Sequence, residues 1–208
     1  IKVTRATLIP RPETELVVDE ALEAAGAIGS NAVIVDLCTG SGCIAVSVAA
    51  ELTRCRVYAT DISPAALEVA RENAVLNGVA DRVEFFEGDL FAPLPGRLKG
   101  AVDIIISNPP YVSLSEMEGL APEVRDFEPG TALFGGVDGL DFLEKIIEQA
   151  PGYLKKGGRL IMEIGYSQSE KVKEMAEKDG RYGAIGLRKD YSGIERIFSA
   201  RLKQGGGG

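Results

Sequence analysis

The sequence predicts an α/β protein with a mostly parallel sheet of about seven strands, helices on both faces and an antiparallel edge. Short stretches that are apolar throughout alternate with helix-like segments, which is typical of a parallel sheet covered on both faces. Polar and glycine-rich residues follow directly after several of these stretches. In such sheets ligands bind beyond the carboxyl ends of the strands. The last two strands are separated only by a short polar turn at 190–193, which predicts the antiparallel edge.

The helix starts carry recognisable signals. Pro12 opens a helix, Ser63 caps another with Pro64 at its first position, and Gly78 ends that second helix. The expected helices cover residues 12–26, 43–52, 63–77, 140–149 and 168–178. The expected strands cover residues 32–37, 56–60, 83–87, 102–107, 159–164, 184–188 and 195–200, with Gly157-Gly158 as a turn into the fifth strand. A long loop rich in Pro, Gly and Glu is expected to follow the fourth strand and to reach about Asp138.

Composition excludes several classes of function. A chain of 208 residues with 45% hydrophobic residues fits one globular domain, and no apolar run reaches the roughly 18 residues that span a membrane. The chain has no histidine, which excludes histidine-based metal sites, triads and general bases. A net charge of −8 argues against stable binding of nucleic acid. The three cysteines, Cys38, Cys43 and Cys55, are odd in number and lie in apolar surroundings, so we expect free thiols in a reducing cytoplasm.

A glycine-rich loop follows the first predicted strand. Residues 40–45 read G-x-G-x-x-A, and Asp61 lies about 20 residues further on, at the end of the next strand. Such glycines let the backbone approach a ligand closely, and the carboxylate can accept hydrogen bonds from ribose hydroxyls. The pattern fits a dinucleotide or a nucleoside ligand, and the glycines could also serve a tight turn alone.

The other strand ends favour S-adenosylmethionine over NAD. A dehydrogenase needs a site for hydride transfer, usually with an acid or base, and no histidine is present. A methyltransferase needs a carboxylate near the adenine amine, which Asp89 supplies, while Leu90 offers an apolar face to the ring. The predicted cofactor-binding residues are Cys38, Thr39, Gly40, Ser41, Gly42, Asp61, Asp89, Leu90 and Asn108.

The strongest motif is Asn108-Pro109-Pro110-Tyr111, directly after the fourth predicted strand. Two consecutive prolines fix the backbone there. The turn can aim the Asn108 side-chain oxygen and the Pro109 carbonyl at one point, where they would hold the two hydrogens of an NH₂ group. Tyr111 can lie flat against a planar substrate. The alternative is a rigid turn between sheet and loop.

These motifs together resemble the class I amino-methyltransferases, which have a Rossmann-like fold. Residues 8–15, including Arg11-Pro12-Glu13, resemble the segment before the catalytic domain of release-factor glutamine N5-methyltransferases of the HemK type. Further similar stretches lie at 128–129, 132–133, 135–136, 138–141, 163–165 and 190–193, so the resemblance covers essentially the whole chain.

The resemblance implies methylation of the glutamine in the Gly-Gly-Gln motif of a peptide-chain release factor. Arg11, Pro12 and Glu13 are expected to contact this protein substrate together with Asn108-Pro109-Pro110-Tyr111. Residues 11–15 and the loop at 113–137 are expected to flank the entrance where the substrate docks. Cys38 replaces the first glycine of the family's common loop, and we expect this small residue to be tolerated. We expect residues 1–204 to form the catalytic domain and residues 205–208 a flexible glycine tail. The family's N-terminal helical domain is expected to be absent.

Three alternatives remain open on the residues alone. An adenine N6-methyltransferase acting on DNA or RNA could use the same Asn-Pro-Pro-Tyr geometry on a flipped base. Ribosomal-protein glutamine methyltransferases share the motif, although they usually lack the Arg-Pro-Glu-Thr-Glu run. A scaffold protein that keeps the fold without catalysis is the third alternative.

Overall fold

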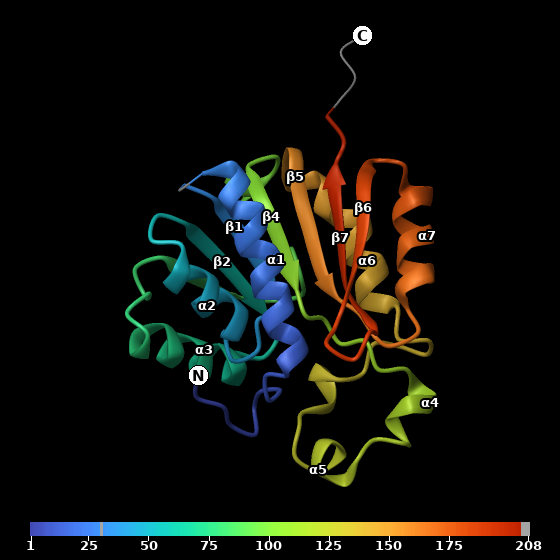
Figure 1. Ribbon diagram of the computed structural model, residues 1–208. Helices are drawn as coiled ribbons and strands as arrows, with labels where there is room; N and C mark the ends of the chain where they lie inside the picture. The colour runs from blue at the N-terminus through green and yellow to red at the C-terminus, as the bar shows by residue number, and fades with distance from the viewer. Residues whose placement is uncertain (30, 205–208) are drawn as a thin grey trace.

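The computed structural model describes residues 1–29 and 31–204 and confirms the α/β fold (Figure 1). Seven strands form one sheet in the order β3-β2-β1-β4-β5-β7-β6. The pairs from β3 to β5 are parallel, whereas β7 is antiparallel to both β5 and β6. The predicted antiparallel edge is therefore confirmed. The strands are β1 (Val33–Leu37), β2 (Arg56–Asp61), β3 (Val83–Glu87), β4 (Val102–Ser107), β5 (Leu154–Glu163), β6 (Tyr182–Lys189) and β7 (Glu195–Leu202).

The helices begin close to where the capping signals predict. α1 starts at Pro12, and α3 starts at Pro64 with the Ser63 hydroxyl accepting a hydrogen bond of 3.2 Å from the Ala66 N–H. Such a cap satisfies one of the free N–H groups of the first turn. The longer helices are α1 (Pro12–Ile28), α2 (Cys43–Glu51), α3 (Pro64–Leu76), α6 (Asp141–Gln149) and α7 (Ser169–Asp179).

Successive residues of the central strands pack against opposite layers of helices. Ile34 belongs to the core beneath α1 and α2, and Val35 belongs to the core beneath α6 and α7. In β4, Ile104 and Ile106 face the first layer while Ile105 faces the second. A strand buried on both faces needs apolar residues throughout, which explains why these strands show no polar alternation.

One predicted strand boundary is wrong. Gly157 and Gly158 lie inside β5, not in a turn before it. The pairing moves from Val102–Leu154 to Ile104–Arg159, so the extra residues of β5 form a bulge that includes both glycines. The predicted loop after β4 is present and contains two single-turn helices, α4 (Leu114–Met117) and α5 (Pro122–Arg125).

The segment before α1 and the loop that carries α4 and α5 both lie beyond the carboxyl ends of the parallel strands (Figure 1). They cover the edge of the sheet where the polar motifs end. Among the described helices, none is long and apolar enough to cross a membrane. The glycine tail at 205–208 lies outside the described residues.

Candidate active site

A cavity of about 630 Å³ lies at this edge of the sheet. Residues that follow four different strands line it, as expected from the crossover topology of parallel sheets. The residues predicted from the sequence that line this cavity are Cys38, Thr39, Gly40, Ser41, Asp61, Asp89, Leu90, Asn108 and Pro110. The motifs therefore meet in one space although they are spread over 70 residues of sequence, from Cys38 to Asn108.

Asp36, which lies in β1, holds the loop after this strand in place. One oxygen of this buried carboxylate accepts hydrogen bonds from the Thr39 hydroxyl (2.6 Å) and the Ala45 N–H (3.2 Å). Burial raises the pKa of Asp36 to about 7, although these two hydrogen bonds act in the opposite direction. Gly42 does not line the cavity; it has φ +78°, and a Cβ there would lie 3.0 Å from the Cβ of Ala70. Gly42 thus permits close packing of the loop on α3.

Asp61, at the end of β2, connects two loops at the cavity wall. Its carboxylate accepts hydrogen bonds from the Gly40 N–H (2.8 Å) and the Ser63 N–H (2.9 Å). Burial raises the pKa of Asp61 above its ordinary value, while these backbone donors lower it. The carboxylate is therefore held in a fixed position between the glycine-rich loop and the start of α3.

Asp89 and Leu90 follow β3 and form another part of the wall. Asp89 is exposed, and no described residue donates a hydrogen bond to its carboxylate. Leu90 is buried and adopts a left-handed φ of +44°, which turns the chain back beneath the cavity. The pair places an acceptor and an apolar surface side by side, as the sequence predicts for an adenine site.

Asn108 stands at the end of β4 with its amide held on one side only. Its Nδ2 donates to the Thr14 hydroxyl at 3.3 Å. Its Oδ1 accepts no hydrogen bond from any described residue, and the side chain lines the cavity. Pro109 and Pro110 are buried, and of the two only Pro110 lines the cavity.

Tyr111 does not line the cavity. Its hydroxyl donates to the Glu163 carboxylate at 3.0 Å, and its carbonyl accepts from the Gln168 side chain at 3.0 Å. Burial and the neighbouring Glu163 raise the pKa of the phenol well above its ordinary value. The ring is thus held against the core in this structure, away from the cavity lining that the sequence-based interpretation gave it.

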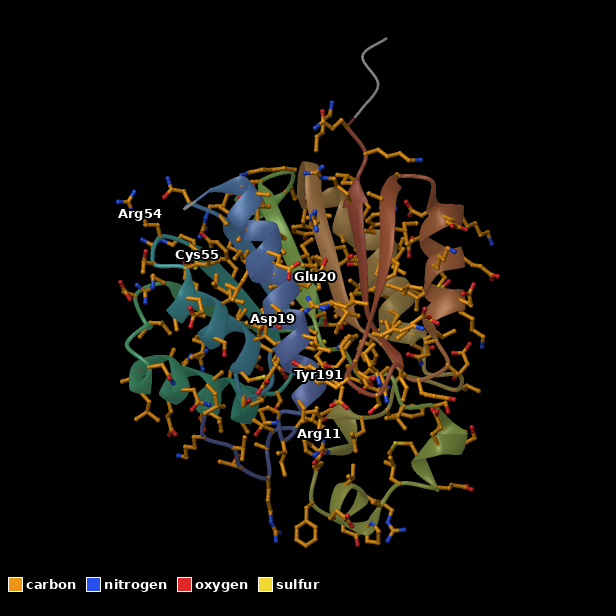
Figure 2. The ribbon with its side chains drawn as sticks, in the orientation of Figure 1. Arg11, Asp19, Glu20, Arg54, Cys55 and Tyr191 are labelled. Atoms are coloured by element: carbon orange, nitrogen blue, oxygen red, sulfur yellow. The ribbon has the colours of Figure 1, made fainter. Side chains whose placement is uncertain are left out.

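The predicted substrate-contacting residues at the start of α1 lie beside the cavity and do not line it. Arg11 precedes α1 and forms an ion pair of 2.6 Å with Glu128, which is on the loop after α5. Figure 2 shows Arg11 between the first turn of α1 and this loop. Pro12 is exposed and Glu13 is half-buried.

Several cavity residues were not predicted from the sequence. Thr14, in the first turn of α1, reaches the cavity, as do the preceding segment, the loop at 129–136 and the first turns of α6. Gly135 fits this loop against the Asn-Pro-Pro-Tyr segment, because a Cβ there would lie 2.6 Å from the Pro110 carbonyl oxygen. The paired glycines at 135–136 were the one signal in the sequence for such a close approach. The three cysteines are free thiols, and two of them, Cys38 and Cys43, line the cavity.

The fold and the site together are those of a methyltransferase, and comparisons with known proteins agree with this class. Residues 28–199 match the family model described as methyltransferase domain. The chain is therefore a methyltransferase.

Individual relatives show to which family of methyltransferases the chain belongs. The release factor glutamine methyltransferase of Cereibacter sphaeroides is 47% identical over 201 residues, which are 97% of this chain and 69% of that protein. That of Moorella thermoacetica is 48% identical over 203 residues, 98% of this chain and 70% of that protein. A solved protein-(glutamine-N5) methyltransferase (release factor-specific) from Alicyclobacillus acidocaldarius superimposes with a TM-score of 0.57 at 26% identity, over 98% of this chain and 100% of that chain. The chain belongs to the release factor glutamine methyltransferase family.

Proposed function

We propose that this chain transfers a methyl group from S-adenosylmethionine to the side-chain amide nitrogen of a glutamine in a peptide-chain release factor, within its Gly-Gly-Gln motif. The observation that carries this proposal is the free Oδ1 of Asn108 in the cavity. A fixed acceptor at this point suits an NH₂ donor, and a primary amide is such a donor.

The residues present fit the cofactor. The cavity wall carries three carboxylates, Asp61, Asp89 and Asp141, against one cation, Lys145, which suits a positively charged ligand. Asp61 would hold the ribose hydroxyls, and Asp89 with Leu90 would hold the adenine ring. The loop from Cys38 to Ser41 would hold the remainder, with Asn108 at the reacting end.

S-adenosylmethionine, when bound, supplies an electrophilic methyl group. The nucleophile is poor, because the lone pair of an amide nitrogen is delocalised. Asn108 Oδ1 would accept one amide hydrogen and hold the nitrogen in line. The Pro109 carbonyl, which does not line the cavity in this structure, would accept the other hydrogen when the substrate is bound. Both acceptors also favour the positive charge that develops on nitrogen. The methylated nitrogen can lose its extra proton to water, so no dedicated base is needed.

The entrance to the cavity suits a protein substrate. The two segments that cover this edge of the sheet, the segment before α1 and the loop after β4, carry exposed apolar side chains, of which Phe134 lines the cavity: Ile9, Leu114, Phe127, Phe134 and Val137. Apolar groups gathered at a cavity mouth are typical of a protein-docking surface. We propose that the release factor docks here, with Arg11, Pro12 and Glu13 at the border of its footprint, and that the reaction takes place in the cytoplasm, where translation ends.

Label transfer to a panel of substrates tests this proposal. The protein is incubated with methyl-labelled S-adenosylmethionine and either a release factor, the same factor with its Gly-Gly-Gln glutamine changed to alanine, or adenine-containing RNA and DNA. We expect label only on the unmodified factor. Label on the nucleic acids would support the adenine alternative instead, and label on the alanine variant would place the acceptor elsewhere in the protein.

A further inference from the structure

We propose that Thr14 and Glu163 are positioning residues that fix the Asn108 amide with its oxygen toward the cavity. The inference rests on the proposed function of Asn108 and extends it to two residues on other elements. Glu163 lies at the end of β5 and Thr14 lies in the first turn of α1, and neither is among the predicted catalytic, cofactor-binding or substrate-binding residues.

The orientation of the Asn108 side-chain amide follows from the number of protons that its neighbours can donate. A threonine hydroxyl has one proton to donate, and an ionised carboxylate can only accept. The Thr14 hydroxyl donates to Glu163 Oε2 at 2.9 Å, so toward Asn108 it can only accept. The group that faces it at 3.3 Å must therefore be the Asn108 NH₂, which leaves Oδ1 for the cavity. Without this constraint the two ends of the amide would be nearly equivalent in shape.

Burial of the Glu163 carboxylate is unfavourable for the stability of the fold. Its side chain is buried, and both of its oxygens are occupied by hydroxyl donors, from Thr14 and Tyr111. Burial raises the pKa of Glu163, while the hydrogen bonds from Thr14 and Tyr111 lower it. Arg196 also lowers this pKa, but its own ion pair is with Asp190, at 3.4 Å. A buried carboxylate without a cation destabilises the fold. A purely structural position would be filled more favourably by an apolar side chain.

The network joins segments that are far apart in sequence. Thr14 is 94 residues from Asn108 and 149 residues from Glu163. The carboxylate also holds the Tyr111 hydroxyl, so the first and last residues of the Asn-Pro-Pro-Tyr motif are tied to one buried group. The Glu163 carboxylate thereby determines where the Thr14 and Tyr111 hydroxyls donate, at the two ends of the motif.

Thr14→Val tests the constraint because valine has the shape of threonine without the hydroxyl. The Asn108 NH₂ then faces a methyl group, and the productive orientation leaves a buried N–H without a partner. We expect the single-turnover rate of methyl transfer, at saturating cofactor and release factor, to fall about tenfold or more. Cofactor affinity should change little, because the proposed ribose and adenine contacts lie on Asp61 and Asp89. Thr14→Ser restores the hydroxyl and should restore the rate. Glu163→Gln no longer obliges Thr14 to donate and should also slow transfer.

Thr60→Val is the matched control. Thr60 is buried close to the cavity, and its hydroxyl has no hydrogen-bond partner. The substitution changes the same atoms as Thr14→Val without breaking a hydrogen bond, so the transfer rate should stay at the parent value.

A double-mutant cycle separates positioning from a general structural role. Asn108→Ala alone should lower the rate by about 10²–10³. Adding Thr14→Val to Asn108→Ala should cause no further loss, because Thr14 acts only through Asn108. A further loss equal to that in the parent background, or a Thr14→Val enzyme as fast as the parent, would overturn the inference while leaving the proposed function standing. An Asn108→Ala enzyme as fast as the parent would instead overturn the proposed role of Asn108 itself.

Discussion

At the scale of single residues, the site depends on carboxylates held out of water at the ends of strands. Asp36, Asp61 and Glu163 all have pKa values raised by burial. Each accepts hydrogen bonds that fix a neighbouring loop or side chain. Burying these carboxylates lowers the stability of the fold, but their hydrogen bonds hold the site in one geometry. Asp61 follows from the sequence because it ends a predicted strand at the expected spacing. The partnership of Thr14 with Glu163 does not, because it depends on a contact across 149 residues.

Asp36 should make fold stability depend on pH. Its pKa is about 7 in the folded protein and 3.8 ordinarily, so the folded state favours the protonated form. The contribution of this group is fully present below pH 3.8 and is lost as pH rises through about 7, by at most about 1.4 kcal/mol per pH unit. Urea unfolding between pH 4 and 8 should show a smaller decline with rising pH for Asp36→Asn than for the parent. Identical pH profiles would contradict the burial of a titrating carboxylate.

Asp61 should contribute chiefly to cofactor binding. Asp61→Ala removes a fixed acceptor from the proposed ribose site and frees the N–H groups of Gly40 and Ser63. We expect the affinity for S-adenosylmethionine to fall by about 1.5–3 kcal/mol, the range for hydrogen bonds to a charged group. Calorimetry provides the measurement. Unchanged affinity would remove Asp61 from the ribose role, and binding of NAD without S-adenosylmethionine would contradict the cofactor assignment.

At the scale of elements, local sequence signals predict where helices start better than they predict the conformation of loops. Pro12, Pro64 and Ser63 mark the first turns of α1 and α3 because capping and proline geometry act within a few residues. The bulge in β5 was missed, since two glycines indicate a turn unless the partner strand is known. The helical turns α4 and α5 are too short to show a periodic pattern.

The loop after β4 should depend on Arg11 for its stability. Glu128 is buried, and one of its oxygens has no hydrogen-bond partner, so the ion pair with Arg11 is its main compensation. Arg11→Ala leaves that charge unpaired, and we expect faster amide hydrogen exchange over residues 113–137. Arg54→Ala is the matched control, because Arg54 lies on the far side of the molecule from this loop (Figure 2). Equal exchange in the Arg11→Ala variant and the parent would show that the loop is held by other contacts.

At the scale of the whole molecule, the sheet topology brings the motifs together. The order β3-β2-β1-β4 places the ends of four strands side by side, so Asp89, Asp61, Gly40 and Asn108 converge. This part was predictable, because parallel strands end at one edge of a sheet. The cover over the edge was predictable only in part. Residues 11–15 and the loop at 113–137 are expected beside the entrance, whereas the segment before Arg11 meets the cavity only through tertiary packing.

The account's central claim is that this cavity holds the side-chain amide of a glutamine for methylation. The most direct measurement is the position of the methyl group in the product. A release factor methylated by the purified protein is digested, and the modified peptide is fragmented by tandem mass spectrometry. The account predicts a single added methyl on the side-chain nitrogen of the glutamine in Gly-Gly-Gln. A methyl group on a carboxylate, on a backbone nitrogen or on any other residue would contradict it.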